Sequence, residues 1–328
     1  MKMKKHIGYG IAVCLLLLQG MAMAVTTEWA NPAPGDWATA SNWATGNVPT
    51  SLDDTRIRPP GSSSFVQVTL DSAGAAGRLL LDNGTGLTVA ANGILTVGNV
   101  GRTQLGNATT SLGSTITIDG GQMSVASEVI IGERGSGMLT VNSGTFSVGG
   151  AWLIPGYVAG GYGHITVNGG ALNTAGHIYT GLNGSGDLTV GGGNVYVGGT
   201  LIVANSAASV STIAINGGVT SVGGLDFGRA GTQTLDLNGG QLITRGGFAA
   251  GVNNTFYIGS GELVFGGGQS LYDIQNLVAG ANWVFDDTAS VFEREGTVVV
   301  TSIPEPATIG LLGLFGGALI AIRRYRLI

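Results

Sequence analysis

Residues 165–174, Ile-Thr-Val-Asn-Gly-Gly-Ala-Leu-Asn-Thr, contain one copy of a motif that recurs along most of this 328-residue chain. The motif has an alternating apolar segment, an Asn-Gly-Gly corner and a second alternating segment. Its other copies are Thr117-Ile-Asp-Gly-Gly121, Thr140-Val-Asn-Ser-Gly144, Thr189-Val-Gly-Gly-Gly193, Ala214-Ile-Asn-Gly-Gly218 and Asp236-Leu-Asn-Gly-Gly240, with a looser one near Thr88. They are 22 to 26 residues apart. A period of this size in a chain with 60 glycines predicts a solenoid in which each repeat is one coil.

Each repeat predicts two short β-strands with one face inward and one face outward. Apolar residues occupy every second position before the corner, as in Leu188 and Val190, and after it, as in Val195 and Val197. We therefore predict an all-β parallel β-helix of about 7–9 coils with a cap at each end. Strand lengths alone also fit a barrel or a sandwich, but neither fold explains the period.

The corner residues predict how successive coils stack. Glycine pairs permit backbone conformations that other residues avoid. Asn142, Asn168, Asn216 and Asn238 share one register, and we expect Asn to support left-handed turns there and its amide to bond to the copy in the next coil.

The segment before the repeats is rich in tryptophan. It contains Trp29, Gly35-Asp36-Trp37, Asn42-Trp43, Gly46-Asn47-Val48-Pro49 and Asp53-Asp54. This pattern resembles the start of β-helical passenger-like modules in exported bacterial proteins, including autotransporter-type repeats. We interpret Trp29, Trp37 and Trp43 as a cap over the apolar end of the solenoid. The alternative is that these rings form a glycan-binding platform.

The C-terminal segment has three parts in a fixed order. Pro304, Glu305 and Pro306 precede the uncharged apolar run 307–322, and Arg323, Arg324 and Arg326 follow it. This order resembles the PEP-CTERM sorting signal of Gram-negative bacteria. The resemblance implies export, transient retention in the inner membrane and processing by an exosortase, with Pro304-Glu305-Pro306 as the recognition motif.

The apolar run itself is short for a membrane helix. Sixteen residues span about 24 Å, whereas the hydrocarbon core is about 30 Å thick, so we expect the arginines to extend toward the lipid surface. Positive residues after the span would hold the C-terminus in the cytoplasm and the body outside. The alternative is a buried C-terminal helix of a soluble domain.

The N-terminus predicts a signal peptide. Lysines precede an apolar stretch, and Ala22-Met23-Ala24 is a cleavage site before Val25. We therefore expect the Sec export machinery as a partner. Cys14 is removed with this peptide, so the mature chain has no cysteine for disulfides or thiolate metal sites.

The charge of the mature body excludes one class of partner. Residues 25–303 contain 8 arginines against 18 acids, a formal net charge of −10. Affinity for nucleic acid depends on basic side chains that contact phosphates, so we expect no nucleic-acid binding.

The sequence gives little support for catalysis. Between Asn83 and Tyr272 there are seven acids: Asp119, Glu128, Glu133, Asp187, Asp226, Asp236 and Glu262. They do not repeat in register, although lyases and glycoside hydrolases need carboxylates on one face. His164 and His177 are the histidines of the mature chain and are a weak zinc hypothesis. We expect no catalytic residue, no metal and no cofactor.

We divide the chain into a signal peptide (1–24), a Trp-rich cap (25–65), Gly-rich solenoid repeats (66–268), a C-terminal cap (269–301) and the sorting segment with its short transmembrane helix (302–328). The expected function is that of a non-enzymatic surface or extracellular-matrix protein, associated with exopolysaccharide or the cell envelope through Thr-, Ser- and Asn-rich outer faces. The alternative is a carbohydrate-active lyase or hydrolase.

Overall fold

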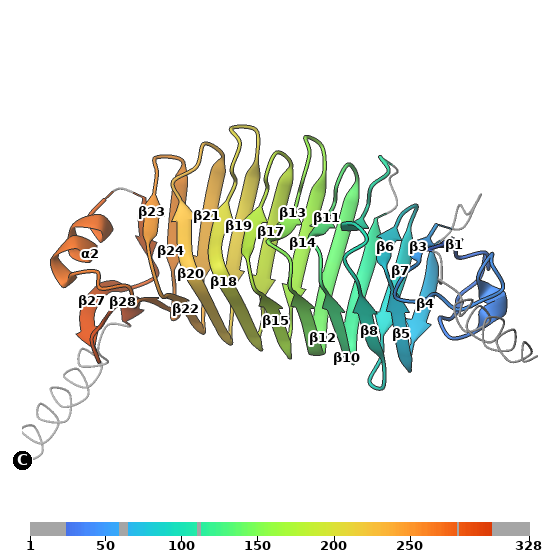
Figure 1. The fold of residues 1–328 in the computed structure, drawn as a ribbon. Helices are drawn as coiled ribbons and strands as arrows, with labels where there is room; N and C mark the ends of the chain where they lie inside the picture. Colours follow the sequence, from blue (N-terminus) through green and yellow to red (C-terminus); the bar gives the residue numbers. More distant parts are fainter. Residues whose placement is uncertain (1–23, 59–64, 110–112, 281, 304–328) are drawn as a thin grey trace, which may run out of the picture.

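The chain forms three parallel β-ladders that wind around one apolar core (Figure 1). The structure is a computed structural model and describes residues 24–58, 65–109, 113–280 and 282–303. Each complete coil contributes one strand to every ladder, whereas the first coil has no ladder 3 strand and the last adds only β26 to ladder 2. Successive coils pair in register along the long axis of the molecule. The predicted parallel β-helix is therefore confirmed.

The ladders are named here by their order within a coil. Ladder 1 contains β1 (Thr26–Glu28), β3 (Asp54–Ile57), β6 (Arg78–Leu81), β9 (Thr103–Leu105), β11 (Val129–Ile131), β13 (Trp152–Pro155), β16 (His177–Thr180), the second halves of β18 (Asn194–Val203) and β20 (Val219–Phe227), and β23 (Phe248–Ala250).

Ladders 2 and 3 flank the Asn-Gly-Gly corner. Ladder 2 contains β2 (Gly35–Asp36), β4 (Val66–Leu70), β7 (Thr85–Val89), the first halves of β10 (Ser114–Val125) and β12 (Ser136–Val148), β14 (Tyr162–Val167), β17 (Ser185–Val190), β19 (Val210–Ile215), β21 (Thr232–Leu237), β24 (Asn254–Ile258) and β26 (Trp283–Phe285). Ladder 3 contains β5 (Ala73–Ala76), β8 (Ile94–Val97), the second halves of β10 and β12, β15 (Ala171–Thr174), the first halves of β18 and β20, β22 (Gln241–Thr244) and β25 (Glu262–Phe265).

The solenoid has about ten turns, which is more than the 7–9 predicted. The difference arises partly at the N-terminal end. There β1 and β2 already pair in parallel with β3 and β4, so the tryptophan-rich segment supplies strands as well as the end of the core. No Asn-Gly-Gly corner marks these strands in the sequence, and the repeat pattern therefore did not predict them.

The alternating apolar side chains form the core, and residues in register stack on one another. One inner column of ladder 2 runs through Ile116, Leu139, Ile165, Leu188, Ile213, Leu235 and Phe256. All of these side chains are 0–1% exposed. Burying one such aliphatic side chain contributes about 1.5–3 kcal/mol, so the repeated columns supply most of the hydrophobic stabilisation of the fold.

Glycine, rather than Asn, takes the left-handed conformation at the corner between ladders 2 and 3. Gly170 has φ +65°, whereas Asn142, Asn168, Asn216 and Asn238 are not among the residues with positive φ. The expectation that Asn supports the left-handed turn was therefore wrong. The predicted amide contacts do form, because Nδ2 of Asn168 donates to Oδ1 of Asn142 (3.0 Å) and Nδ2 of Asn238 donates to Oδ1 of Asn216 (3.1 Å).

The C-terminal end of the solenoid changes strand direction. Helix α2 (Leu271–Val278) leads into β26, and β27 (Thr288–Arg294) and β28 (Thr297–Ile303) then form a hairpin. Strand β28 also pairs antiparallel with β25, whereas the ladder pairs before it are parallel. The hairpin therefore covers the last strand edge of ladder 3 and ends the repeat.

The predicted signal peptide (1–24, except Ala24) and the apolar run 307–322 lie outside the described residues. Among the residues that are described, no helix has the length and apolar character needed to span a membrane.

Candidate functional site

The three tryptophans of the N-terminal segment fill the end of the core. Trp29 and Trp37 are 0% exposed, and Trp43 is 2% exposed. Trp43 contacts both other rings edge to face, with centroid distances of 5.1 Å to Trp29 and 4.9 Å to Trp37. A buried ring offers no face to a sugar, so the alternative that these residues form a glycan platform is wrong.

The residues predicted for sorting are not part of the described fold. Pro304, Glu305, Pro306, Arg323, Arg324 and Arg326 follow the last described residue, and the cleavage-site residue Ala22 precedes the first. Strand β28 ends at Ile303, directly before Pro304. The described body thus ends at the residue before the predicted recognition motif.

The seven acids of the repeat region are spread over the faces of the solenoid. Asp119 lies in the corner between ladders 2 and 3, Asp187 and Asp236 lie on ladder 2, Asp226 lies on ladder 1, Glu262 lies on ladder 3, and Glu128 and Glu133 flank β11. Several are held by neighbours: Glu128 pairs with Arg102 (2.8 Å), Asp226 with Arg229 (2.7 Å) and Glu262 with Arg294 (2.6 Å). In the strand pairs of the described residues, no acid of the repeat region is the register partner of another acid, which agrees with the prediction that these acids do not repeat in register.

One of these acids interacts with an exposed tyrosine on ladder 2. The hydroxyl of Tyr162 donates to Asp187 (2.6 Å), while the other carboxylate oxygen accepts from the backbone N–H of Thr212 (2.8 Å). Burial, together with the neighbouring Asp187 carboxylate, raises the pKa of Tyr162 to about 12. This tyrosine therefore remains protonated at neutral pH and acts as a hydrogen-bond donor.

The two histidines lie on different faces. His164 is on ladder 2, and His177 begins β16 of ladder 1, where its Nδ1 accepts from the backbone N–H of Thr200 (2.9 Å). Within the part of the chain that the structure describes, no group of three His, Cys, Asp or Glu side chains is arranged to hold a metal ion.

Ladder 2 presents a regular row of threonines on its outer face. Thr69, Thr88, Thr117, Thr140, Thr166 and Thr189 are register partners in six successive coils. Neighbouring strands are about 4.7–4.9 Å apart, so the row repeats at that interval along the axis. This polar face is one of the Thr-rich outer surfaces that the sequence predicts.

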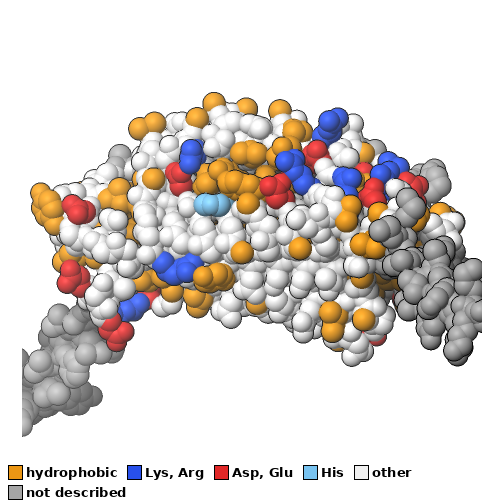
Figure 2. Space-filling model, viewed as in Figure 1, with side chains coloured by type: hydrophobic (Ala, Val, Ile, Leu, Met, Phe, Trp, Pro, Cys, Tyr) orange, Lys and Arg blue, Asp and Glu red, His pale blue; other side chains and the backbone are white. Residues whose placement is uncertain are grey.

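An aromatic pocket on the outer face of ladder 1 was not predicted from the sequence. A pocket of about 210 Å³ is lined by seven residues: Trp152, Tyr157, Tyr179, Ile154, Leu182, Arg102 and Glu128. We name these seven residues the ladder 1 pocket. Figure 2 shows apolar side chains gathered in the middle of one face of the body, between acidic and basic side chains and beside a histidine.

Adjacent coils place the rings of the ladder 1 pocket side by side. Trp152 begins β13 and is the register partner of His177 in β16, and the two rings stack with centroids 5.0 Å apart. Tyr179, two residues further along the same face, lies 5.1 Å from Trp152 at an interplanar angle of 51°. Ile154, two residues after Trp152 in β13, also lines the pocket and is only 5% exposed.

The polar side of the ladder 1 pocket is an ion pair. Nε of Arg102 lies 2.8 Å from Glu128, and Nη1 of Arg102 donates to the hydroxyl of Tyr157 (3.3 Å). The guanidinium carbon also lies 5.5 Å from the centroid of the Tyr157 ring, a cation–π distance. The side chains of Arg102 and Glu128 are 48% and 27% exposed, so both charges remain accessible to a ligand.

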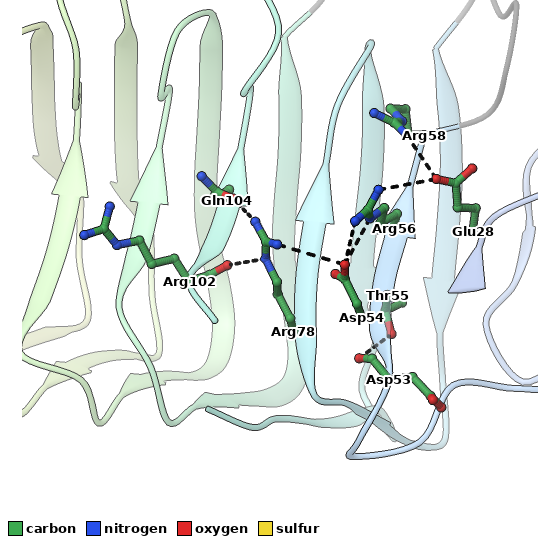
Figure 3. A network of polar contacts seen from close by, with 9 residues as sticks. All are labelled: Glu28, Asp53, Asp54, Thr55, Arg56, Arg58, Arg78, Arg102 and Gln104. Carbon is green, nitrogen blue, oxygen red and sulfur yellow. Dashed lines mark hydrogen bonds and ion pairs between the residues drawn. The ribbon is translucent and has the colours of Figure 1, made fainter. Parts of the chain in front are cut away.

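A chain of polar contacts leads along ladder 1 to this ion pair (Figure 3). Glu28 pairs with Arg58 (3.0 Å), Arg56 pairs with Asp54 (2.7 Å), and Nε of Arg78 donates to the backbone carbonyl of Arg102 (3.1 Å). The last of these contacts joins Arg78 to the backbone of Arg102, one of the two partners in the ion pair.

A second hollow adjoins the ladder 1 pocket. It has a volume of about 320 Å³ and is lined by Asn99, Ser127 and Ala151, together with Arg102 and Glu128. Both hollows have Arg102 and Glu128 in their lining, so they lie beside the same ion pair.

Comparison with known proteins identifies the C-terminal segment. Residues 302–326 match the family model of the PEP-CTERM protein-sorting motif. The predicted resemblance is confirmed, and the motif implies export, sorting to the cell envelope and recognition by an exosortase processing enzyme. A search of curated proteins and a search of solved structures found no match to the chain.

Proposed function

We propose that this protein is a non-enzymatic β-solenoid of the bacterial surface or extracellular matrix, delivered by its PEP-CTERM signal and associated with exopolysaccharide or the cell envelope. The observation that carries the proposal is the position of the motif. The match covers residues 302–326 and so begins at the last two residues of β28, the strand that completes the described body.

The proposed route begins with the Sec machinery, which recognises the segment that ends at the Ala22-Met23-Ala24 cleavage site. The apolar run 307–322 then holds the chain in the inner membrane of a Gram-negative cell, with Arg323, Arg324 and Arg326 on the cytoplasmic side. The exosortase recognises Pro304, Glu305 and Pro306 and releases the body from this anchor.

The solenoid supports an interaction role rather than a catalytic one. Its outer faces present rows of Thr, Ser and Asn side chains, and the acids of the repeat region are spread over separate positions. Glycoside hydrolysis usually requires two carboxyl groups about 5–9.5 Å apart, whereas Glu128 of the ladder 1 pocket is paired with Arg102.

The alternative is a carbohydrate-active enzyme that uses the ladder 1 pocket. The observation in its favour is the carboxylate of Glu128 beside two aromatic rings. Assays of the mature protein on neutral and acidic polysaccharides, with and without calcium, distinguish the two functions. Turnover that is lost in Glu128→Gln contradicts the non-enzymatic proposal.

The sorting proposal is tested by the intact mass of the protein from the envelope and medium of its native host. We expect loss of residues 1–24 and of the segment after Pro-Glu-Pro. Replacing Pro304, Glu305 and Pro306 by alanine is expected to leave the tail on the protein. Unchanged processing of this variant contradicts recognition through the motif. Replacement of Thr288 and Ser290 by alanine, outside the motif, is the control.

A further inference from the structure

We propose that the ladder 1 pocket binds a neutral saccharide unit of a glycan chain, with Trp152 and Tyr179 as the stacking platform and Arg102 with Glu128 as the hydroxyl-binding pair. The inference rests on the proposed association with exopolysaccharide and names the place and the chemistry of that contact.

The first argument is the presence of aromatic side chains at outward positions of a solenoid. The inward positions of these strands, such as Leu153 and Ile178, are 0% exposed and fill the core. Trp152 and Tyr179 point away from that core, and both contribute to the surface of the pocket. Large rings with an apolar face and a polar edge are suited to a ligand that has both kinds of surface, as a pyranose does.

The second argument is the chemistry of the ion pair. A guanidinium donates hydrogen bonds and a carboxylate accepts them, so Arg102 and Glu128 together can satisfy neighbouring sugar hydroxyls, each of which both donates and accepts. Their direct contact of 2.8 Å and the hydrogen bond from Arg102 to Tyr157 hold both groups in place before a ligand arrives. A preorganised pair reduces the entropy that binding costs.

The third argument concerns charge and selects a neutral glycan over an acidic one. Arg102 and Glu128 have opposite charges and cancel locally, so no free cation is provided for a uronate or a sulfate. The body as a whole has a formal net charge of −10 over residues 25–303, and a field of that sign disfavours the approach of a polyanion.

The fourth argument is the second hollow beside the ladder 1 pocket. The ladder 1 pocket of about 210 Å³ and the second hollow of about 320 Å³ both have Arg102 and Glu128 in their lining. The ion pair can therefore contact one saccharide unit on the rings and the next unit of the same glycan chain in the second hollow.

The test is equilibrium binding by calorimetry of the purified mature protein to soluble neutral hexose and N-acetylhexosamine oligosaccharides, with oligogalacturonate as the acidic comparison. We expect saturable binding of at least one neutral oligosaccharide. Trp152→Ala is expected to weaken it by about tenfold or more, as truncation of a central aromatic anchor does. Tyr257→Ala is the matched control, because Tyr257 is a 45% exposed ring on ladder 2.

A second variant keeps the test independent of any loss of packing. Glu128→Gln preserves the shape of the side chain and both rings, and we expect weaker binding with an unchanged urea midpoint. Absence of binding to every neutral oligosaccharide overturns the inference. Preference for oligogalacturonate, or equal binding by the parent, Trp152→Ala and Glu128→Gln, overturns it as well.

Failure of this inference and failure of the proposed function give different results. Co-fractionation of the mature protein with the exopolysaccharide of its host is measured for the parent and for Trp152→Ala. If both proteins co-fractionate equally, the proposed association stands and the pocket is not its site. If the parent does not co-fractionate but binds a neutral oligosaccharide through Trp152, the pocket inference stands and the exopolysaccharide association fails.

Discussion

Substitution of Gly170 by alanine tests whether the corners of the solenoid are packed against the coil below. Gly170 has φ +65°, and a Cβ atom there would lie 2.4 Å from the carbonyl oxygen and 2.8 Å from the nitrogen of Gly144. The left-handed conformation costs a non-glycine residue about 1–2 kcal/mol. Overpacking adds about 1–3 kcal/mol, because the backbone of Gly144 is fixed in its own coil. We therefore expect Gly170→Ala to destabilise the protein by about 2–5 kcal/mol.

Gly160 is the matched control for this substitution. It has φ +83°, but nothing lies within 4 Å of the position its Cβ would take. Gly160→Ala therefore has the conformational cost of about 1–2 kcal/mol without the contact. Urea unfolding of the purified proteins, followed by circular dichroism, gives the two free energies. Equal destabilisation by both substitutions would refute the close packing of successive corners.

Two further predictions concern the core and the C-terminal cap. Phe146→Ala removes a ring that is 0% exposed on ladder 3, and we expect it to lower the free energy of unfolding in urea by about 3–5 kcal/mol. Ser147→Ala, on the outer face of the same strand, is expected to change this free energy little. Similar destabilisation by both substitutions contradicts the assigned faces. Hydrogen bonds from Arg294 (2.7 and 2.6 Å) hold the pKa of Glu262 below its ordinary value of 4.5, against the opposing effect of burial. A lowered folded-state pKa stabilises the protein above the ordinary value, and this contribution is lost as the pH falls through the folded value. Glu262→Gln is therefore expected to reduce the decrease of the urea midpoint at acid pH, and Arg294→Gln is expected to have the same effect. If the pH profile of the urea midpoint is unchanged in both variants, the Glu262–Arg294 pair is not the source of this acid sensitivity.

The repeat architecture was predictable because ladders 2 and 3 flank a recognisable corner. Alternation in β17 and in the first half of β18 follows the burial pattern of the structure, with Leu188, Val190, Val195 and Val197 inside. The corner between these ladders needs a residue that tolerates positive φ, and glycine supplies it at a fixed spacing. Period and alternation therefore gave the fold class and the direction of each side chain on two of the three faces.

Ladder 1 was missed because its strands do not alternate in the same way. In β11 all three residues, Val129, Ile130 and Ile131, are buried, and Ile154 and Ile202 are nearly buried at outward positions of later coils. A short run in which every residue is apolar shows no alternation of apolar and polar residues, so it lacks the period-two signal of a half-buried strand. The ladder 1 pocket lies on this face, so it was missed together with the strands. The available signal was the occurrence of Trp152 and Tyr179 in adjacent repeats, on the same face and two positions apart in register.

The N-terminal tryptophans illustrate a different limit of prediction from the sequence. Their clustering in the sequence fits both a cap and a sugar platform, because the same rings serve either purpose. Only the edge-to-face contacts of Trp43 with Trp29 and Trp37, which bury all three, separate the two interpretations.

The last strand also determines how the body responds to a pull on its C-terminus. Strand β28 lies between β25 and β27, is antiparallel to both, and ends at Ile303. Tension applied at the C-terminus is therefore shared between two sets of backbone hydrogen bonds, those that join β28 to β25 and those that join it to β27. A cut beyond Ile303 removes none of these bonds.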